Sequence, residues 1–194
     1  MDKFSYSIGL GIGQNLKGMG TVDLNVEDFA QAVKDVLTGA EPAISHTEAR
    51  QIVNEYFEKL EERMNAENIE KGKAFLEANK NNPNVKVLPS GLQYEVIREG
   101  NGKRPKATDQ VRCHYEGTLI DGTLFDSSIQ RGEPAVFGVN QVIKGWVEAL
   151  QLMSEGAKWK LYIPSELGYG AAGAGAMIPP HSVLIFEVEL IEVL

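Results

Sequence analysis

The sequence has 194 residues, 43% of them apolar and 24% charged, and a formal net charge of −8 at pH 7. This size and composition are typical of a globular protein with one large or two small domains. The acidic balance argues against a protein that coats nucleic acid or an anionic membrane, because the negative charge of the protein would repel the phosphate groups of either partner. The single cysteine, Cys113, excludes an intrachain disulfide, and no apolar run is long enough to predict a membrane span.

Two short helices are predicted at the N-terminus. In the first segment, apolar side chains recur at every fourth position: Phe4, Ile8, Ile12 and Leu16. This spacing is typical of one apolar helix face. A second helix is expected over residues 26–38, because Asn25 is a favourable N-cap and Gly39 is a favourable C-cap.

Five glycines lie in the first of these segments: Gly9, Gly11, Gly13, Gly18 and Gly20. A phosphate-binding loop would explain them, but the segment has neither a G-x-G-x-x-G fingerprint after a strand nor a G-K-[ST] ending. The spacing Gly9-x-x-x-Gly13 instead leaves two bare positions on one helix face, where another helix can approach closely. We therefore expect no nucleotide cofactor, and close packing of this helix against another helix.

A long helix is predicted next, over about residues 45–80. Ser45 and Glu48 form the S-x-x-E pattern of a capping box, and apolar residues follow at helical spacing as far as Ile69. Lysine and glutamate occupy the other faces, at spacings that favour ion pairs. Residues 1–84 are thus expected to form an all-α domain that ends in this connecting helix.

The period changes at the polar segment 79–91, which contains two prolines. Beyond it, apolar residues alternate as in half-buried strands in four segments: 91–97, 110–119, 157–164 and 182–194. The dipeptide Asp121-Gly122 predicts a hairpin turn, and residues 145–153 predict one short helix. Residues 85–194 are therefore expected to form a curved antiparallel sheet wrapped over one helix, which makes the fold class α+β.

Side chains that could hold a metal or act as nucleophiles are sparse and scattered. His46, His114 and His181 lie far apart, without an H-x-x-x-H spacing or paired cysteines, so no metal site is expected. No G-x-S-x-G motif is present and Cys113 lies in an alternating apolar run, which disfavours a covalent hydrolase.

Aromatic residues are spread over the strand-rich half, and spacing alone is compatible with a plain aromatic core or with an apolar cleft. The segment ELGYGAAGAGAMIPPHS, residues 166–182, favours the cleft. It is too apolar for a solvated linker, and a long loop of this kind usually covers or borders a site.

Four motifs of this half resemble the FKBP-type peptidyl-prolyl cis-trans isomerases in order and spacing, over about residues 87–194. They are VRCHYEGTLIDGTLFDSS, QVIKGWVEAL, IPSELGYGAAG and MIPPHSVLIFEVEL. The segments YSIGLGIGQNLK and DLNVEDFAQAVKDVLTG are similar to the dimerisation domain of bacterial two-domain members, the macrophage infectivity potentiator group. The resemblance covers nearly the whole chain. It implies that residues 1–84 are a dimerisation domain, with a homodimer formed through the N-terminal helices within residues 1 to about 60.

The resemblance also implies the site residues, each by its place in these motifs. Three would be catalytic: Tyr115, Asp126 and Tyr169. Seven would bind the substrate: Phe125, Phe137, Val142, Ile143, Trp146, Ile178 and Phe186. Ala135 and Ala174 stand where single-domain eukaryotic members carry an aromatic residue and often a histidine, so a more open rim is expected.

The implied activity is rotation of X-Pro bonds in protein substrates, which assists folding and uses no cofactor, metal or covalent intermediate. The alternative is a dimeric holdase or adaptor in which turnover is secondary. The expected partners are proline-containing polypeptides, a second copy of the chain and macrolide inhibitors, but neither nucleic acid nor a membrane. The expected compartment is the cytoplasm, or the periplasm if a leader peptide has been removed.

Overall fold

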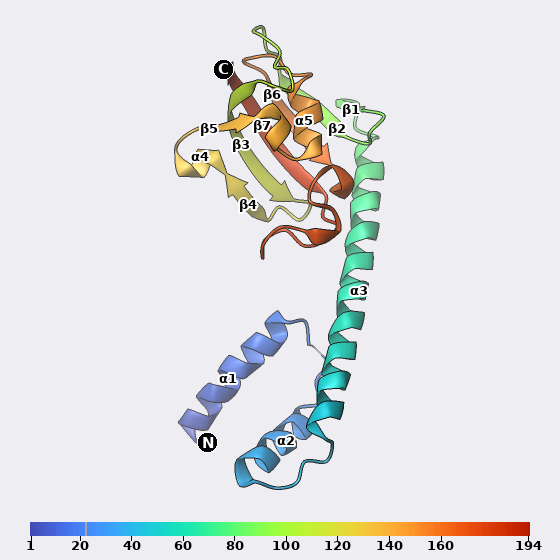
Figure 1. Cartoon of the computed structure of the whole chain (residues 1–194), viewed down its shortest axis with the longest axis vertical. Coiled ribbons are helices and arrows are strands. Elements are labelled where there is room, and N and C mark those ends of the chain that lie inside the picture. Colours follow the sequence, from blue (N-terminus) through green and yellow to red (C-terminus); the bar gives the residue numbers. More distant parts are fainter. Residues whose placement is uncertain (22) are drawn as a thin grey trace. The chain divides into compact units, whose positions relative to one another are not determined.

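The chain divides into two compact units, Met1–Arg63 and Met64–Leu194. A computed structural model describes residues 1–21 and 23–194 (Figure 1). The expected domain boundary between residues 84 and 85 stays a prediction.

The N-terminal unit consists of α1 (Lys3–Gly18), α2 (Val26–Thr38) and the beginning of α3 (His46–Asn79). Side-chain and glycine caps explain where α2 begins and ends. The Asn25 side chain accepts hydrogen bonds from the N–H groups of Glu27 and Asp28, and Gly39 closes the helix with a φ of 71°. Both predicted caps are confirmed.

Helix α3 is 34 residues long, as the periodicity predicted. At its start, the Ser45 hydroxyl accepts a hydrogen bond of 3.2 Å from the N–H of Glu48, which is one half of the predicted capping box. Near its end, Lys71 and Glu67 form an i, i+4 ion pair at 3.4 Å.

The apolar faces of the N-terminal unit are largely uncovered. Phe4 is 75% exposed, Ile8 53% and Leu37 80%, whereas Leu60 is buried. The described part of this unit therefore exposes apolar surface on α1 and α2 that a small monomeric unit would be expected to bury.

The C-terminal unit is built on a seven-stranded sheet in which every pairing is antiparallel. Its strands are β1 (Val85–Val87), β2 (Gln93–Arg98), β3 (Gln110–Leu119), β4 (Leu124–Ser127), β5 (Ala135–Gly138), β6 (Lys158–Ile163) and β7 (Leu184–Val193). The order is β1-β2-β6-β7-β3-β4, and β5 also pairs with β3. The predicted hairpin turn is confirmed, since Gly122 joins β3 to β4 with a φ of 86°.

Short helices complete the C-terminal unit, of which α4 (Ser128–Arg131) and α5 (Lys144–Leu150) matter most for the site. Figure 1 shows α5 lying across one face of the sheet. Gly145 permits this packing, because a Cβ there would lie 2.6 Å from Cγ2 of Ile163. The fold is thus the predicted α+β arrangement of an antiparallel sheet over one short helix, preceded by helices.

The core lies between the sheet and α5. Alternate residues of β3 point inward, and Val111, Cys113 and Tyr115 are buried. From the helix, Trp146 and Leu150 complete the same apolar cluster. Burial raises the pKa of the Cys113 thiol to about 12, so this cysteine is a small core residue and not a nucleophile.

Candidate active site

An open cleft of about 650 Å³ lies at one end of this core. Its lining combines side chains of β3, β4, β5 and β7 with residues of α5 and of the loop before β7. The residues that line it are Tyr115, Phe125, Asp126, Phe137, Gln141, Val142, Ile143, Trp146, Tyr169, Ala174, Met177, Ile178 and Phe186. All ten residues proposed from the sequence are among them, so the fold brings together side chains that lie up to 71 positions apart, from Tyr115 to Phe186.

Aromatic rings surround Trp146, which stands in the first turn of α5 and is only 3% exposed. The rings of Tyr115, Phe137 and Phe186 lie 5.4, 5.6 and 5.3 Å from it. The interplanar angles are 87°, 79° and 83°, which is the edge-to-face geometry that aromatic pairs prefer. The tryptophan is therefore held in one orientation by its neighbours.

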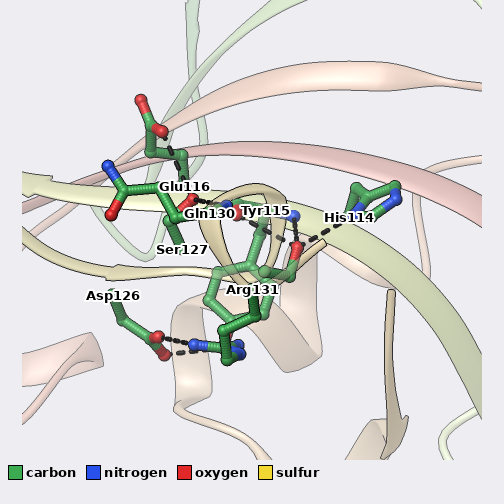
Figure 2. A network of polar contacts seen from close by, with 8 residues as sticks. His114, Tyr115, Glu116, Asp126, Ser127, Gln130 and Arg131 are labelled. Carbon is green, nitrogen blue, oxygen red and sulfur yellow. Dashed lines mark hydrogen bonds and ion pairs between the residues drawn. The ribbon is translucent and has the colours of Figure 1, made fainter. Parts of the chain in front are cut away.

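One edge of the cleft is polar. The Tyr115 hydroxyl donates a hydrogen bond of 2.6 Å to Oδ2 of Asp126. Arg131 pairs with Oδ1 of the same carboxylate through Nη1 and donates from Nη2 to the Tyr115 hydroxyl at 2.7 Å (Figure 2). Its guanidinium also lies 5.5 Å from the centre of the Tyr115 ring. The three side chains form a closed triangle of charge-assisted contacts.

This triangle sets the protonation of its members. Burial raises the pKa of Asp126, but the hydrogen bonds from Tyr115 and Arg131 and the charge of Arg131 together outweigh it, and the pKa lies below its ordinary value. Burial raises the pKa of Tyr115, and the bond to Asp126 raises it further against the opposing effect of Arg131. At neutral pH the site thus presents a carboxylate and a protonated phenol.

Two serines fix the elements that carry the triangle. The Ser128 hydroxyl accepts a bond of 2.8 Å from the N–H of Tyr115 and lies 3.0 Å from Nδ1 of His114. The Ser127 hydroxyl caps α4 by accepting from the N–H of Gln130 at 3.1 Å (Figure 2). Since α4 ends at Arg131, this cap also helps to place the guanidinium.

The loop before β7 contributes part of the cleft lining. Ala174 and Ile178 exchange two backbone hydrogen bonds, of 2.9 and 3.1 Å, which draw the loop together. Gly173 is required there, because its φ is +62° and a Cβ would lie 2.4 Å from the carbonyl oxygen of Ile178. The loop thereby turns Ile178 inward, whereas Tyr169 remains 41% exposed.

Two profiles of known families match the chain. The family described as FKBP-type peptidyl-prolyl cis-trans isomerase matches residues 101–191, and the one described as the domain amino terminal to FKBP-type peptidyl-prolyl isomerase matches residues 1–96. The chain belongs to the FKBP-type peptidyl-prolyl cis-trans isomerases.

Relatives of this isomerase chain match it over nearly its whole length. The FKBP-type 22 kDa peptidyl-prolyl cis-trans isomerase of Escherichia coli is 48% identical, over 98% of this chain and 94% of the relative. The outer membrane protein MIP of Legionella longbeachae is 43% identical, over 99% of this chain and 85% of the relative. The crystal structure of FkpA from Escherichia coli, 36% identical, superposes with a TM-score of 0.81 and covers 98% of this chain and 95% of that one.

The FKBP-type cleft contains residues that sequence reasoning did not propose. Gln141 and Met177 line it directly, and Arg131 acts through Tyr115 and Asp126. Gln141 and Met177 adjoin proposed residues in their motifs, so adjacency was an available signal. No sequence signal indicated Arg131. In the residues that the structure describes, no cluster of histidine, cysteine, aspartate or glutamate could hold a metal ion.

Proposed function

We propose that the chain accelerates cis-trans rotation of X-Pro bonds in polypeptides and so assists folding. The observation that carries this proposal is the apolar cleft around Trp146, which has one fixed polar edge. Family matches over both halves of the chain support it. The holdase alternative, with turnover secondary, is not favoured, since the relatives are named as isomerases.

Rotation about the X-Pro bond requires a change in the surroundings of the amide and no covalent step. The planar amide is held by resonance, and rotation crosses a barrier of about 18–20 kcal/mol. A twisted amide loses that resonance and part of its charge separation. A site that removes water from the carbonyl therefore destabilises the planar state relative to the twisted one, with no bond made or broken.

The geometry supports a division of roles among the cleft residues. Trp146 would form the floor on which the proline ring stacks. Six apolar residues would form the walls: Phe125, Phe137, Val142, Ile143, Ile178 and Phe186. The N–H of Ile143, which precedes α5, and the hydroxyl of Tyr169 would hold substrate carbonyls. Asp126, fixed by Tyr115, would present a polar edge to the rotating carbonyl without having to reorganise.

An exchange assay on a proline-containing peptide tests this function. Either NMR exchange spectroscopy or a protease-coupled assay should show acceleration by the full chain, and a macrolide that fills the cleft should inhibit it. Exchange at the uncatalysed rate in the presence of folded protein would contradict the proposal.

A homodimer through the N-terminal helices belongs to the same proposal. The described part of the N-terminal unit leaves its apolar stripes exposed, and a mainly apolar groove of about 550 Å³ lies among residues such as Leu16, Phe29 and Tyr56. A Cβ atom at Gly9 or at Gly13 would meet no other atom within 4 Å, so their helix face is open. Helices of a second copy would cover this apolar area.

The compartment is a further part of the proposal. In residues 1–21 and 23–194, no helix is both long enough and apolar enough to cross a bilayer. The Legionella relative is named an outer membrane protein, which assigns that protein to the cell envelope. This favours the periplasm over the cytoplasm expected from the sequence, and cell fractionation of the native protein tests it.

A further inference from the structure

The last turns of α3 are anchored on the sheet of the C-terminal unit. Gln93 of β2 is a polar residue with only 1% exposure. Its Nε2 donates to the carbonyl of Leu76 at 2.9 Å, and its Oε1 accepts from Nδ2 of Asn79 at 2.9 Å. Phe75 adds an aromatic contact with Tyr162 of β6, with ring centres 6.0 Å apart. The last turns of α3 are therefore held against β2 and β6 of the sheet.

One turn earlier, α3 passes unusually close to the segment that leads into β7. Gly72 is buried, and a Cβ at this position would lie 2.8 Å from Cγ2 of Val183. Glycine is disfavoured inside helices relative to alanine. Its presence here is explained by this approach, which a methyl group would obstruct.

One further turn back, α3 makes a hydrogen bond to the same segment. Nδ2 of Asn68 donates to the carbonyl oxygen of Pro180 at 3.1 Å, across 112 positions of sequence. The amide nitrogen must be the donor, because a carbonyl only accepts. Both residues are partly buried, so the bond is partly shielded from competing water.

The backbone that receives this bond is held away from its relaxed conformation. His181, which follows Pro180, has a φ of 59°. Among the residues that the structure describes, no other residue except glycine has a positive φ. Such conformations persist where surrounding contacts determine them. Two contacts come from nearby: the N–H of His181 bonds to the carbonyl of Gly170 at 2.9 Å, and the Ser182 hydroxyl bonds to that of Pro179 at 2.7 Å. Asn68 supplies a third, from another element.

We propose that Asn68 is a positioning residue of the active site, which holds the turn at residues 179–183 and through it the Ile178 wall of the cleft. Only two peptide bonds separate Ile178 from Pro180. Gly72 serves the same role by letting Val183 pack against the helix. This inference rests on the proposed isomerase function, and it makes the last turns of α3 a support of the substrate site.

The expected kinetic signature is a selective loss of substrate binding. Trp146 and the triangle of Tyr115, Asp126 and Arg131 lie on β3, β4, α4 and α5, and Asn68 contacts none of them through a hydrogen bond. Displacing the Ile178 wall should weaken contacts that planar and twisted substrates share. Loss of such uniform binding raises KM and leaves kcat unchanged.

The test compares three substitutions in the full chain. Asn68→Asp keeps the size of the side chain but places an acceptor against the Pro180 carbonyl. Gly72→Ala pushes a methyl group against Val183, so a merely structural role predicts a loss of stability with an unchanged KM, whereas a positioning role also predicts a raised KM. Asn54→Ala, at an exposed position on the same helix, is the control for a change of asparagine in α3.

Exchange kinetics with a proline-containing peptide should show KM raised several-fold by Asn68→Asp and by Gly72→Ala, with kcat within twofold of wild type. Asn54→Ala should change neither. A KM equal to wild type in both test variants overturns the inference, and so does an equal fall of kcat in both with an unchanged KM.

Peptide titration followed by tryptophan fluorescence separates this inference from the proposed function. If the wild-type chain binds the peptide without accelerating exchange, the proposed function fails. The weaker binding of the Asn68→Asp and Gly72→Ala variants would still support the positioning role, and unchanged binding would contradict it.

Discussion

The hydroxyl of Tyr115 lies 2.6 Å from Oδ2 of Asp126, and it ties the last half of β3 to β4 at the edge of the cleft. Asp126→Leu should therefore lower kcat/KM by about tenfold or more, since a hydrogen bond to a charged group is worth about 1.5–3 kcal/mol. Exchange spectroscopy on a proline peptide measures this effect.

The Asp126→Leu variant also distinguishes isomerase turnover from simple binding of apolar polypeptide segments. Suppression of aggregation of an unfolded protein should survive Asp126→Leu, because the apolar cleft and the N-terminal unit are unchanged. If turnover and suppression fall together in a variant with an intact circular dichroism spectrum, the two properties share one site.

Arg131→Ala should raise the pKa of Asp126. Burial pushes that pKa upward, and Arg131 is one of the two side chains that pull it below its ordinary value. The carboxyl ¹³C shift of Asp126, followed against pH, measures the change. Arg112→Ala, which removes an ion pair with Glu192 on β7, is the matched control and should leave the pKa of Asp126 in place.

The pH dependence of stability follows from the same shift. Because the folded pKa of Asp126 lies below its unfolded value, its contribution is fully present above about pH 4 and is lost as the pH falls through the folded pKa. In Arg131→Ala the folded pKa lies closer to the unfolded value, so that loss should be smaller or vanish. Denaturant midpoints between pH 3 and pH 7 test this, and identical acid profiles for both proteins would count against it.

Gly173→Ala should weaken substrate binding. Its φ of +62° disfavours alanine, at about 1–3 kcal/mol, and its Cβ would meet the Ile178 carbonyl oxygen at 2.4 Å. Gly175→Ala is the control, since its φ is also positive, at +55°, but nothing lies within 4 Å of its Cβ position. A raised KM in Gly173→Ala alone is the expected result, and equal effects of both variants would assign the loss to backbone strain.

Gly9→Leu should weaken the proposed homodimer, because a large side chain would fill the bare helix face. Sedimentation velocity should show the variant dissociating at a higher concentration than wild type, while isomerisation of a short peptide is nearly unchanged. Gly11→Leu points to another side of α1 and should matter less. A wild-type chain that sediments as a monomer would remove the basis of this prediction.

Local sequence patterns were sufficient for most of the secondary structure. The caps at Asn25 and Gly39, the alternation along β3 and the turn at Gly122 depend on neighbouring residues, and the structure confirms them. Long motifs also indicated which side chains line the cleft, because each motif carries its residues at fixed spacing. The catalytic and binding roles assigned to those residues stay predictions.

The sequence alone thus determined the α+β class, the helical N-terminal half and the family, since helix and strand periods and motif spacing are properties of adjacent positions. The tertiary structure decided how Arg131 closes the triangle with Tyr115 and Asp126, and how Asn68 meets Pro180 across 112 positions. Such contacts arise when packed elements bring distant side chains within hydrogen-bond reach. No local pattern encodes them, because the geometry of the whole fold sets those distances.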